Sequence, residues 1–319
     1  MNTPQRFLDA HPPAKHEPCE LDVVTGAFSY TGKYITRRLL SAGRRVRTIT
    51  GHPKRPNSFG KQVEVAPMDF NDPAGLVESL RGASVLYNTY WVRFNHGRAT
   101  FDEGVSNSRV LIQAASEAGV RRIVHVSIAN PSLDSHLPYY SGKAQVEKAI
   151  FDPGLSYAIL RPTVVFGAED ILINNIAWFA RHFPVFAIPG TGRYQLQPIF
   201  VEDLAELATN TAGEEKNVVL DAVGPEIFAF EGLVRQIASA VGSKTKLIHV
   251  SPRITIQLLS LVGRAVGDVI LTREEIEGLM ANLLVSKQQA TATTRFSDWL
   301  AQNAAILGAS YASELQRHY

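Results

Sequence analysis

A tyrosine and a lysine four residues apart are the side chains best suited to chemistry. Tyr139 and Lys143 lie within Leu-Pro-Tyr-Tyr-Ser-Gly-Lys, and on a helix this spacing places both side chains on one face. A phenol has an unperturbed pKa near 10, which a neighbouring ammonium lowers. Ser127, at the end of a predicted strand, could position a substrate oxygen. We expect Ser127, Tyr139 and Lys143 to be the catalytic residues of a carbonyl/alcohol interconversion.

Two structural alternatives compete with this interpretation. Tyr140 could be the exposed phenol, with Tyr139 serving as a packing residue. Lys143 could form a helix-surface ion pair with Glu147, which also lies at i+4 spacing.

The second informative feature is a glycine-containing turn at residues 24–32, Val-Thr-Gly-Ala-Phe-Ser-Tyr-Thr-Gly. It follows an apolar run and opens a helical segment, as a phosphate-binding turn does. Ser29 occupies the position of the middle glycine in a Gly-x-x-Gly-x-x-Gly spacing, between Gly26 and Gly32. The turn alone does not distinguish a nucleotide site from a tight turn, and we expect Ser29 to weaken binding without abolishing it.

The stretch after the predicted second strand bears on the choice of nucleotide. No Asp or Glu occurs between Val23 and Val63, whereas a ribose 2′-hydroxyl usually meets an acid in this region. A 2′-phosphate needs cations, so we favour NADP(H) over NAD(H), with Lys54 and Arg55 best placed to reach the phosphate. A solvated basic face is the alternative. The basic residues are Arg44, Arg45, Arg47, His52, Lys54, Arg55 and Lys61.

Polar residues also follow the next two strands. Asp69 could accept a hydrogen bond from an adenine amino group, while Asp72 fits a helix N-cap. Asn88 and Thr89 end the fourth strand, where doubly wound folds bind ligands. The predicted cofactor-binding residues are Gly26, Phe28, Ser29, Tyr30, Thr31, Gly32, Thr50, His52, Lys54, Arg55, Asp69, Phe70, Asn88, Thr89 and Lys143.

The elements that must position these residues alternate between strands and helices. Repeated strand–helix–strand units predict an α/β fold, a doubly wound parallel sheet covered on both faces. The predicted strands are Leu21–Thr25, Val46–Thr50, Val63–Ala66, Ser84–Tyr87, Ile123–Ser127 and Tyr157–Leu160, and the predicted helices are Lys33–Ala42, Ala74–Leu80, Asp102–Ala118 and Tyr140–Phe151.

The pattern changes after Arg161. We expect residues 166–195 to be loop-rich, followed by a strand at Leu196–Val201, a helix from Asp203, a strand near Asn217–Leu220 and mostly helices thereafter. The predicted organisation is a mobile tail at 1–20 and a dinucleotide-binding core at 21–165, to which 196–221 returns. Residues 166–195 and 222–319 form a smaller, mostly helical substrate-side part.

At this point the chain resembles the short-chain dehydrogenase/reductase superfamily, in its atypical or extended branch. Residues 25–32 resemble its Thr-Gly-x-x-Gly-x-x-Gly turn without the middle glycine, and Ser127, Tyr139 and Lys143 match its Ser and Tyr-x-x-x-Lys elements. Arg161-Pro162-Thr163 resembles an Arg-Pro segment near the nicotinamide, which implies that Pro162 and Thr163 bind the cofactor. Residues 201–205 resemble a later Val-x-Asp-x-Ala element.

A narrower resemblance is to relatives of the nucleotide-binding accessory subunit of mitochondrial complex I and to epimerase/dehydratase-like proteins. It rests on Asn174-Asn175-Ile176-Ala177-Trp178 with Pro189-Gly190. It implies either an NADP(H)-dependent oxidoreductase or epimerase/dehydratase, or a non-catalytic nucleotide-binding protein. In the second case the C-terminal helices, with Trp299, Tyr311 and Tyr319, would bind a protein partner or a second copy.

The composition limits the classes of function that remain. The formal net charge of +2 gives no reason to expect nucleic acid, and the single cysteine, Cys19, fits a cytoplasmic setting. We expect a small-molecule substrate, no metal site and no transmembrane segment. An aromatic-polar group could be either a substrate pocket or an aromatic core; it comprises Tyr90, Trp91, Arg93, Phe94, Asn174, Asn175 and Trp178.

Overall fold

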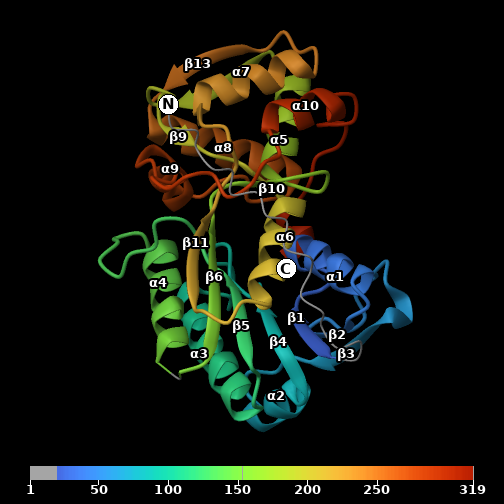
Figure 1. The fold of residues 1–319 in the computed structure, drawn as a ribbon. Coiled ribbons are helices and arrows are strands. Elements are labelled where there is room, and N and C mark those ends of the chain that lie inside the picture. The colour runs from blue at the N-terminus through green and yellow to red at the C-terminus, as the bar shows by residue number, and fades with distance from the viewer. Residues whose placement is uncertain (1–19, 153, 319) are drawn as a thin grey trace, which may run out of the picture.

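A seven-stranded parallel sheet forms the centre of the chain in the computed structural model, which describes residues 20–152 and 154–318 (Figure 1). Its strand order, β11-β6-β5-β4-β1-β2-β3, confirms the predicted doubly wound fold, because the chain moves outward in both directions from β1 and β4. The strands are β1 (Leu21–Thr25), β2 (Arg45–Thr50), β3 (Val63–Pro67), β4 (Ala83–Asn88), β5 (Arg122–Val126), β6 (Ser156–Pro162) and β11 (Val218–Ala222). The predicted mobile tail lies, except for residue 20, outside the described residues.

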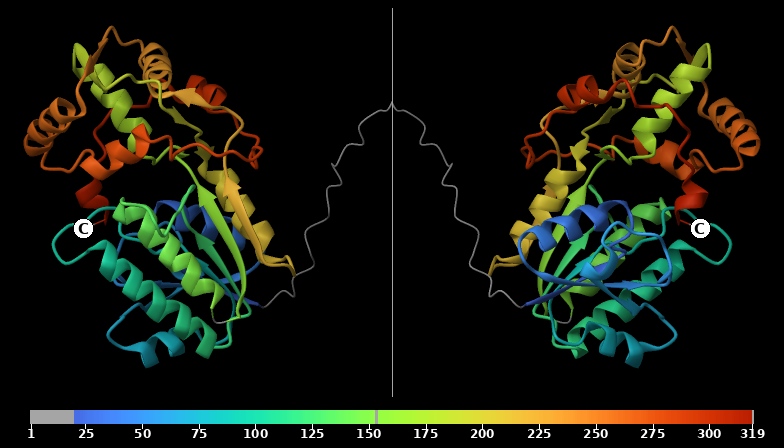
Figure 2. Two further views of the ribbon diagram at one scale, coloured as in Figure 1. Left: turned by 90° about the vertical axis from the view of Figure 1, so that its left-hand side faces the viewer. Right: turned by 90° about the vertical axis from the view of Figure 1, so that its right-hand side faces the viewer.

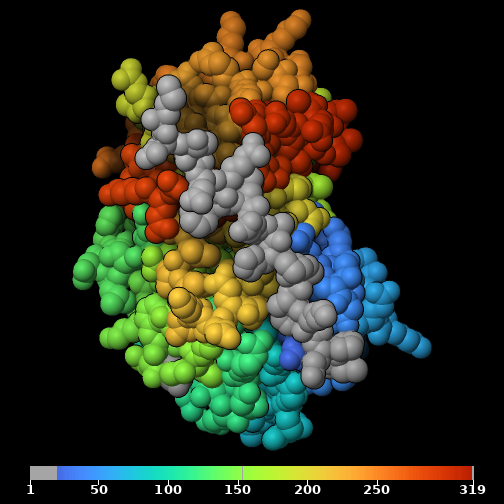
Figure 3. All heavy atoms as spheres, viewed as in Figure 1, coloured from blue at the N-terminus to red at the C-terminus, as the bar shows by residue number. Residues whose placement is uncertain are grey.

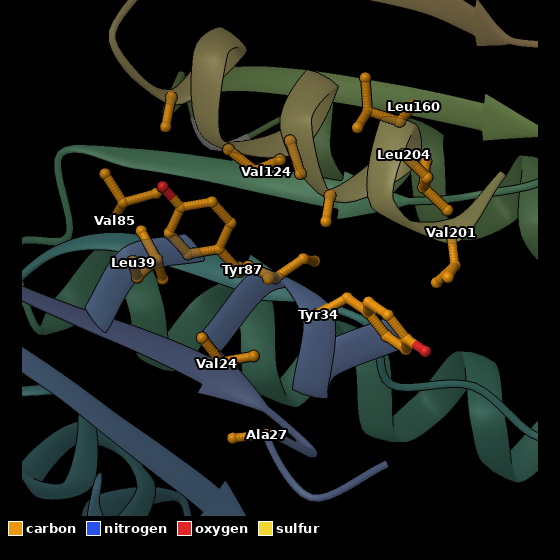
Figure 4. Packing of buried hydrophobic residues seen from close by; sticks show 14 of the residues in the cluster. Val24, Ala27, Tyr34, Leu39, Val85, Tyr87, Val124, Leu160, Val201 and Leu204 are labelled. Carbon is orange, nitrogen blue, oxygen red and sulfur yellow. The ribbon is translucent and has the colours of Figure 1, made fainter. Parts of the chain in front are cut away.

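Helices cover both faces of this sheet. On one face α1 (Tyr30–Ser41) and α6 (Val201–Ala212) pack together, and Figure 4 shows Tyr34 and Leu39 of α1 near Tyr87 of the sheet and Val201 and Leu204 of α6. The other face is covered by α2 (Pro73–Leu80), α3 (Phe101–Glu117) and α4 (Pro138–Phe151). All five residues of β1 are buried, as expected for a central strand with helices on both sides.

The remaining elements gather beyond the carboxyl ends of the strands, where the orange and red residues form one end of the molecule (Figures 1 and 3). An apolar core that includes Phe166, Ile176, Leu233 and Trp299 holds this part together. Its helices are α5 (Leu172–His182), α7 (Phe230–Ala240), α8 (Pro252–Val266), α9 (Arg273–Met280), α10 (Phe296–Asn303) and α11 (Glu314–His318). Its short strands are β7 (Val165–Phe166), β8 (Val185–Pro189), β9 (Gln195–Leu196), β10 (Ile199–Phe200), β12 (Phe228–Ala229) and β13 (Lys246–Val250).

The prediction that residues 166–195 are loop-rich is wrong, because α5 and β8 lie within them. Ile173, Ile176 and Ala180 recur at helical spacing and are buried. Asp170 accepts hydrogen bonds from the backbone N–H groups of the first turn, at 3.1 Å and 2.6 Å. The helical spacing of these buried residues is present in the sequence, but the many aromatic residues of the segment made it less evident.

The predicted strand at Leu196–Val201 is also wrong in part. The structure divides it into β9 and β10, and the helix that follows begins at Val201 instead of Asp203. Pro198 lies at the break and has no N–H group for a strand ladder.

The two side views show the late residues lying over one end of the sheet, with α5 and α8 on the side away from α2 and α3 (Figure 2). None of the helices in the described ranges is long and apolar enough to cross a bilayer.

Candidate functional site

A cavity of about 720 Å³ lies at the carboxyl ends of the central strands, between the sheet and the late helices. This is where a doubly wound sheet binds its ligand, beside the strands at which the order reverses. The predicted residues that line the cavity are Ser29, Tyr30, Thr31, His52, Thr89, Ser127, Tyr139, Lys143, Pro162 and Thr163.

The turn between β1 and α1 has the backbone geometry of a phosphate cradle. Gly26 has a φ of 64°, which favours glycine, and a Cβ on Gly32 would lie 2.2 Å from the carbonyl oxygen of Gly26. Both glycines are therefore required for the close approach of α1 to β1. Tyr30 and Thr31 of the first turn of α1 line the cavity, and the free N–H groups of a helix start can stabilise an anion.

Ser29 fits this turn without strain. Its φ and ψ of −92° and 173° are ordinary extended values, so the position does not require glycine. Its hydroxyl donates a hydrogen bond of 2.6 Å to the carbonyl oxygen of Gly26. The serine side chain therefore takes part in closing the turn.

Side chains at the ends of β1 and β4 bind each other beside this turn. The Thr89 N–H donates to Thr25 Oγ1 at 2.7 Å, and Thr89 Oγ1 donates to the Thr25 carbonyl oxygen at 2.6 Å. Asn88 is fully buried, and its Oδ1 accepts from the Tyr90 N–H at 3.0 Å. The amide nitrogen of Asn88 has no hydrogen-bond partner within 20–152 and 154–318, so a donor is left at this strand end.

The basic stretch after β1 divides into two groups. Arg44 binds Asp22 and Glu20 at 2.7 Å and 2.6 Å, and Arg45 and Arg47 both bind Glu64. These acids come from outside the acid-free window, from residues of or next to the neighbouring strands β1 and β3. The guanidinium groups of Arg44, Arg45 and Arg47 therefore support the sheet and do not reach the cavity.

The residues at and beyond the end of β2 lie closer to the nucleotide turn. His52 lines the cavity, and its N–H binds the Thr50 hydroxyl at 3.0 Å. Arg55 donates to the backbone carbonyl oxygen of Arg317, and Lys54 is exposed. Neither Lys54 nor Arg55 lines the cavity.

The predicted adenine contacts after β3 stand apart from the cavity lining. Asp69 is exposed and accepts hydrogen bonds from the N–H and side chain of Asn71, which shapes the turn before α2. Asp72 caps α2, as expected, by accepting from Gly75 at 2.9 Å. Phe70 packs against Tyr90, with ring centroids 4.9 Å apart.

At the other end of the cavity, the start of α4 separates the two adjacent tyrosines. Tyr139 lines the cavity and packs edge-on against Trp91 and Phe101. Tyr140 is buried, 6% exposed, in a cluster with Ile128 and Leu137. The structure therefore presents Tyr139, and not Tyr140, to a ligand.

Burial governs the protonation of this pair. It raises the pKa of Tyr139 to about 12 and lowers the pKa of Lys143 to about 7. The Lys143 Nζ donates to the Val126 carbonyl oxygen at 3.0 Å and lies 4.7 Å from the centre of the Trp91 ring. The charge that lowers the Tyr139 pKa is that of Arg93 and not, as expected, that of Lys143, and desolvation outweighs it.

Ser127 belongs to a buried ionic group beneath the cavity. Its hydroxyl donates to Glu147 Oε1 at 2.5 Å, and Arg161 binds the same carboxylate at 3.0 Å and 2.5 Å. Glu147, which could have paired with Lys143, thus binds Ser127 and Arg161 instead. The Ser127 proton is engaged, while the lone pairs of its oxygen can still accept a hydrogen bond.

The aromatic-polar group named from the sequence is divided by the structure. Tyr90, Trp91 and Arg93 line the cavity, whereas Phe94 is buried. Asn174 and Asn175 bind the backbone of residues 310–312, and Trp178 packs against Phe179, His182, Phe183 and Tyr311.

Sequence reasoning missed several cavity residues that come from distant segments. Asp170, Glu314 and Arg317 lie more than 120 residues after the nucleotide turn, yet they line the same cavity. Trp299, suggested as a partner contact, is buried against Phe166, while Tyr319 lies outside the described residues.

Comparisons with known proteins agree with this geometry. Residues 26–170 match the NAD(P)H-binding family. The mitochondrial NADH dehydrogenase [ubiquinone] 1 alpha subcomplex subunit 9 of Arabidopsis thaliana is 24% identical over 64% of this chain and 54% of that protein. The chain therefore spans about half the length of this relative.

Two solved structures share the fold across most of the chain. An NADPH-dependent quinone oxidoreductase of Escherichia coli, complexed with NADPH, has a TM-score of 0.72 at 21% identity, covering 89% of this chain and 98% of that one. The triphenylmethane reductase of Citrobacter sp., complexed with NADP(H), has a TM-score of 0.71 at 18% identity, covering 89% and 99%. The chain thus contains a match to the NAD(P)H-binding family over residues 26–170, and it shares its fold with NAD(P)-binding reductases and epimerases.

Proposed function

We propose that the protein is an NADP(H)-dependent reductase of an apolar carbonyl compound. The observation that carries this proposal is that one cavity contains the start of α1 at one end and Tyr139 with Lys143 at the other. A dinucleotide bound with its phosphates at the start of α1 would have Tyr139 within the same enclosure.

The residues present fit such a cofactor. Glycine at position 32 lets α1 begin close against the end of β1, and the Asn88 amide is a buried donor without a partner in the described ranges. In this proposal the N–H groups of Tyr30 and Thr31 hold the pyrophosphate. His52 at the cavity wall, with Lys54 and Arg55 following it along the chain, favours NADP(H) over NAD(H). When bound, the nicotinamide supplies the hydride.

The protonation states favour reduction over oxidation. Because its pKa is about 12, Tyr139 carries its proton at neutral pH and can give it to a substrate oxygen. The Ser127 hydroxyl donates its proton to Glu147, so its oxygen would accept a hydrogen bond from the hydroxyl group of the product. Lys143 maintains the wall of the site through Val126 and Trp91.

The lining indicates the substrate class. Trp91, Val92, Ile128, Ile171 and Leu172 give the enclosure an apolar surface around a few polar groups. An aromatic or aliphatic carbonyl compound matches this surface better than a sugar or a charged acid. Quinones are a suitable first group to test, because a protein of the same fold acts as an NADPH-dependent quinone oxidoreductase.

Substitution of the two adjacent tyrosines tests the proposal. We expect Tyr139→Phe to lower kcat about 100-fold or more with a panel of quinones, aldehydes and ketones, while the Kd for NADPH stays unchanged. Tyr140→Phe is the matched control and should retain turnover, because Tyr140 packs away from the cavity. Equal turnover in wild-type and Tyr139→Phe proteins would refute the assignment of Tyr139.

A second candidate is a nucleotide-binding subunit without turnover. The similarity to NADH dehydrogenase subunit 9 proteins favours it. In that case NADPH would bind with similar affinity to wild-type and Tyr139→Phe proteins, and neither would oxidise it with any carbonyl compound in the panel. Turnover by the wild-type protein is therefore the measurement that distinguishes the two candidate functions.

A further inference from the structure

The last described segment, residues 308–318, returns from the late helices to the nucleotide turn. We call it the strap. The Arg317 guanidinium lies 6.0 Å from the centre of the Tyr30 ring, at the first residue of α1. Arg317 and Glu314 both line the cavity that contains Ser29, Tyr30 and Thr31.

Two asparagines of α5 hold the first part of the strap by its backbone. Asn175 donates to the Ala312 carbonyl oxygen and accepts from the Ala312 N–H, both at 2.9 Å. Asn174 donates to the Ser310 carbonyl oxygen at 2.9 Å and accepts from the Gly308 N–H at 3.0 Å. An asparagine side chain can replace a strand partner in this way, because it carries both a donor and an acceptor.

A buried aspartate holds the second part. The carboxylate of Asp268 accepts from the Tyr311 hydroxyl at 2.7 Å and from the N–H groups of Glu314 and Leu315 at 2.9 Å and 3.0 Å. Glu314 in turn forms an ion pair with Arg93, which also lines the cavity. Side chains of α5, Asp268 and Arg93 thus fix the strap beside the cavity.

These contacts place one guanidinium beside the phosphate turn. Arg317 donates through one nitrogen to the Glu169 carbonyl oxygen, and Arg55 donates to the carbonyl oxygen of Arg317. A guanidinium has five N–H donors, so most of those on Arg317 are not used by the Glu169 carbonyl. Burial lowers the pKa of Arg317, and the nearby carboxylates of Asp170 and Glu169 oppose that shift.

We infer that Arg317 is a ligand of the cofactor pyrophosphate and that the strap completes the cofactor site. The inference rests on the proposed function, since it needs a dinucleotide at the start of α1. Arginine suits this position because its planar group binds two phosphate oxygens at once. The backbone N–H groups of α1 would bind the phosphates from one side and Arg317 from the other.

Fluorescence titration of the full chain with NADPH and with NADH tests the inference. We expect Arg317→Gln to raise both Kd values about tenfold, because both nucleotides contain the pyrophosphate. Arg317→Lys should show a smaller loss, since it keeps the charge without the planar group. Arg235→Gln is the matched control and should bind like wild type, because Arg235 is exposed on α7 and pairs with Glu231.

The outcomes separate this inference from the proposed function. If wild-type protein binds NADPH and Arg317→Gln binds it equally or more tightly, the inference is wrong while the proposed function stands. A loss confined to NADPH would also overturn it, because Arg317 would then contact the 2′-phosphate. If wild-type protein binds neither nucleotide, the proposed function fails and the inference fails with it. Thermal unfolding of each variant checks that the fold is kept, and Arg317→Lys remains informative if Arg317→Gln is unstable.

Discussion

At the start of α1 the cavity wall is made by the backbone of residues 26–32, whereas at the start of α4 it is made by ionisable side chains. In the first region glycine geometry and a serine hydroxyl fix the turn. In the second, Lys143 and Glu147 are both 3% exposed, and each binds an uncharged or oppositely charged neighbour. The first region should therefore respond to steric changes, and the second to pH and to loss of charge.

The largest effect should come from a methyl group in the backbone-built region. We expect Gly32→Ala to destabilise the protein by about 3 kcal/mol and to abolish NADPH binding, because its Cβ would lie 2.2 Å from the Gly26 carbonyl oxygen. Urea denaturation measures the stability. Gly232→Ala is the matched control, since a Cβ on Gly232 of α7 would meet nothing within 4 Å. Similar results for both variants would show that the turn is more pliable than this structure indicates.

A charge removed from the second region should cost somewhat less. Glu147→Gln should lower the unfolding free energy by about 2 kcal/mol, because Arg161 would lose its partner in a partly buried site. Glu206→Gln provides the comparison: its carboxylate is 53% exposed and pairs with Arg38, so its loss should cost less than about 0.5 kcal/mol. Equal costs in urea denaturation would contradict the difference in burial.

The pH dependence of stability should distinguish the regions further. Lys143 has a folded pKa of about 7 and an unfolded value near 10.5, so between these values the unfolded chain binds one more proton. Stability should then rise with pH from about 7 to about 10, by up to about 1.4 kcal/mol per pH unit. Lys143→Met should lose this slope, and Gly32→Ala should keep it. If the unfolding free energy of Lys143→Met rises with pH as steeply as that of the wild type, a group other than Lys143 causes the pH dependence.

The two regions were also unequally predictable from sequence. The turn was recognisable because Gly26, Ser29 and Gly32 are contiguous and follow an apolar strand, and the strand–helix alternation predicted the sheet. The pairing of Ser127 with Glu147 and Arg161 joins three elements, and nothing in local spacing specifies it. Arg317 is further removed still, since its position depends on contacts made by Asn175 and Asp268.

The basic stretch shows how a correct observation can mislead. The absence of acids between Val23 and Val63 holds, yet Asp22 and Glu64 lie one residue beyond each end and bind its arginines. Neighbouring strands of a parallel sheet bring such residues together regardless of their separation along the chain. The cations that remain near the nucleotide turn come from the end of β2 and from the strap.

A crystal structure of the protein with NADPH would test most directly the claim that one cavity joins the two regions around a single cofactor. We predict the pyrophosphate at the N–H groups of Tyr30 and Thr31, and the nicotinamide ring beside Tyr139. A nucleotide bound elsewhere, or one whose nicotinamide points away from Tyr139, would contradict that claim.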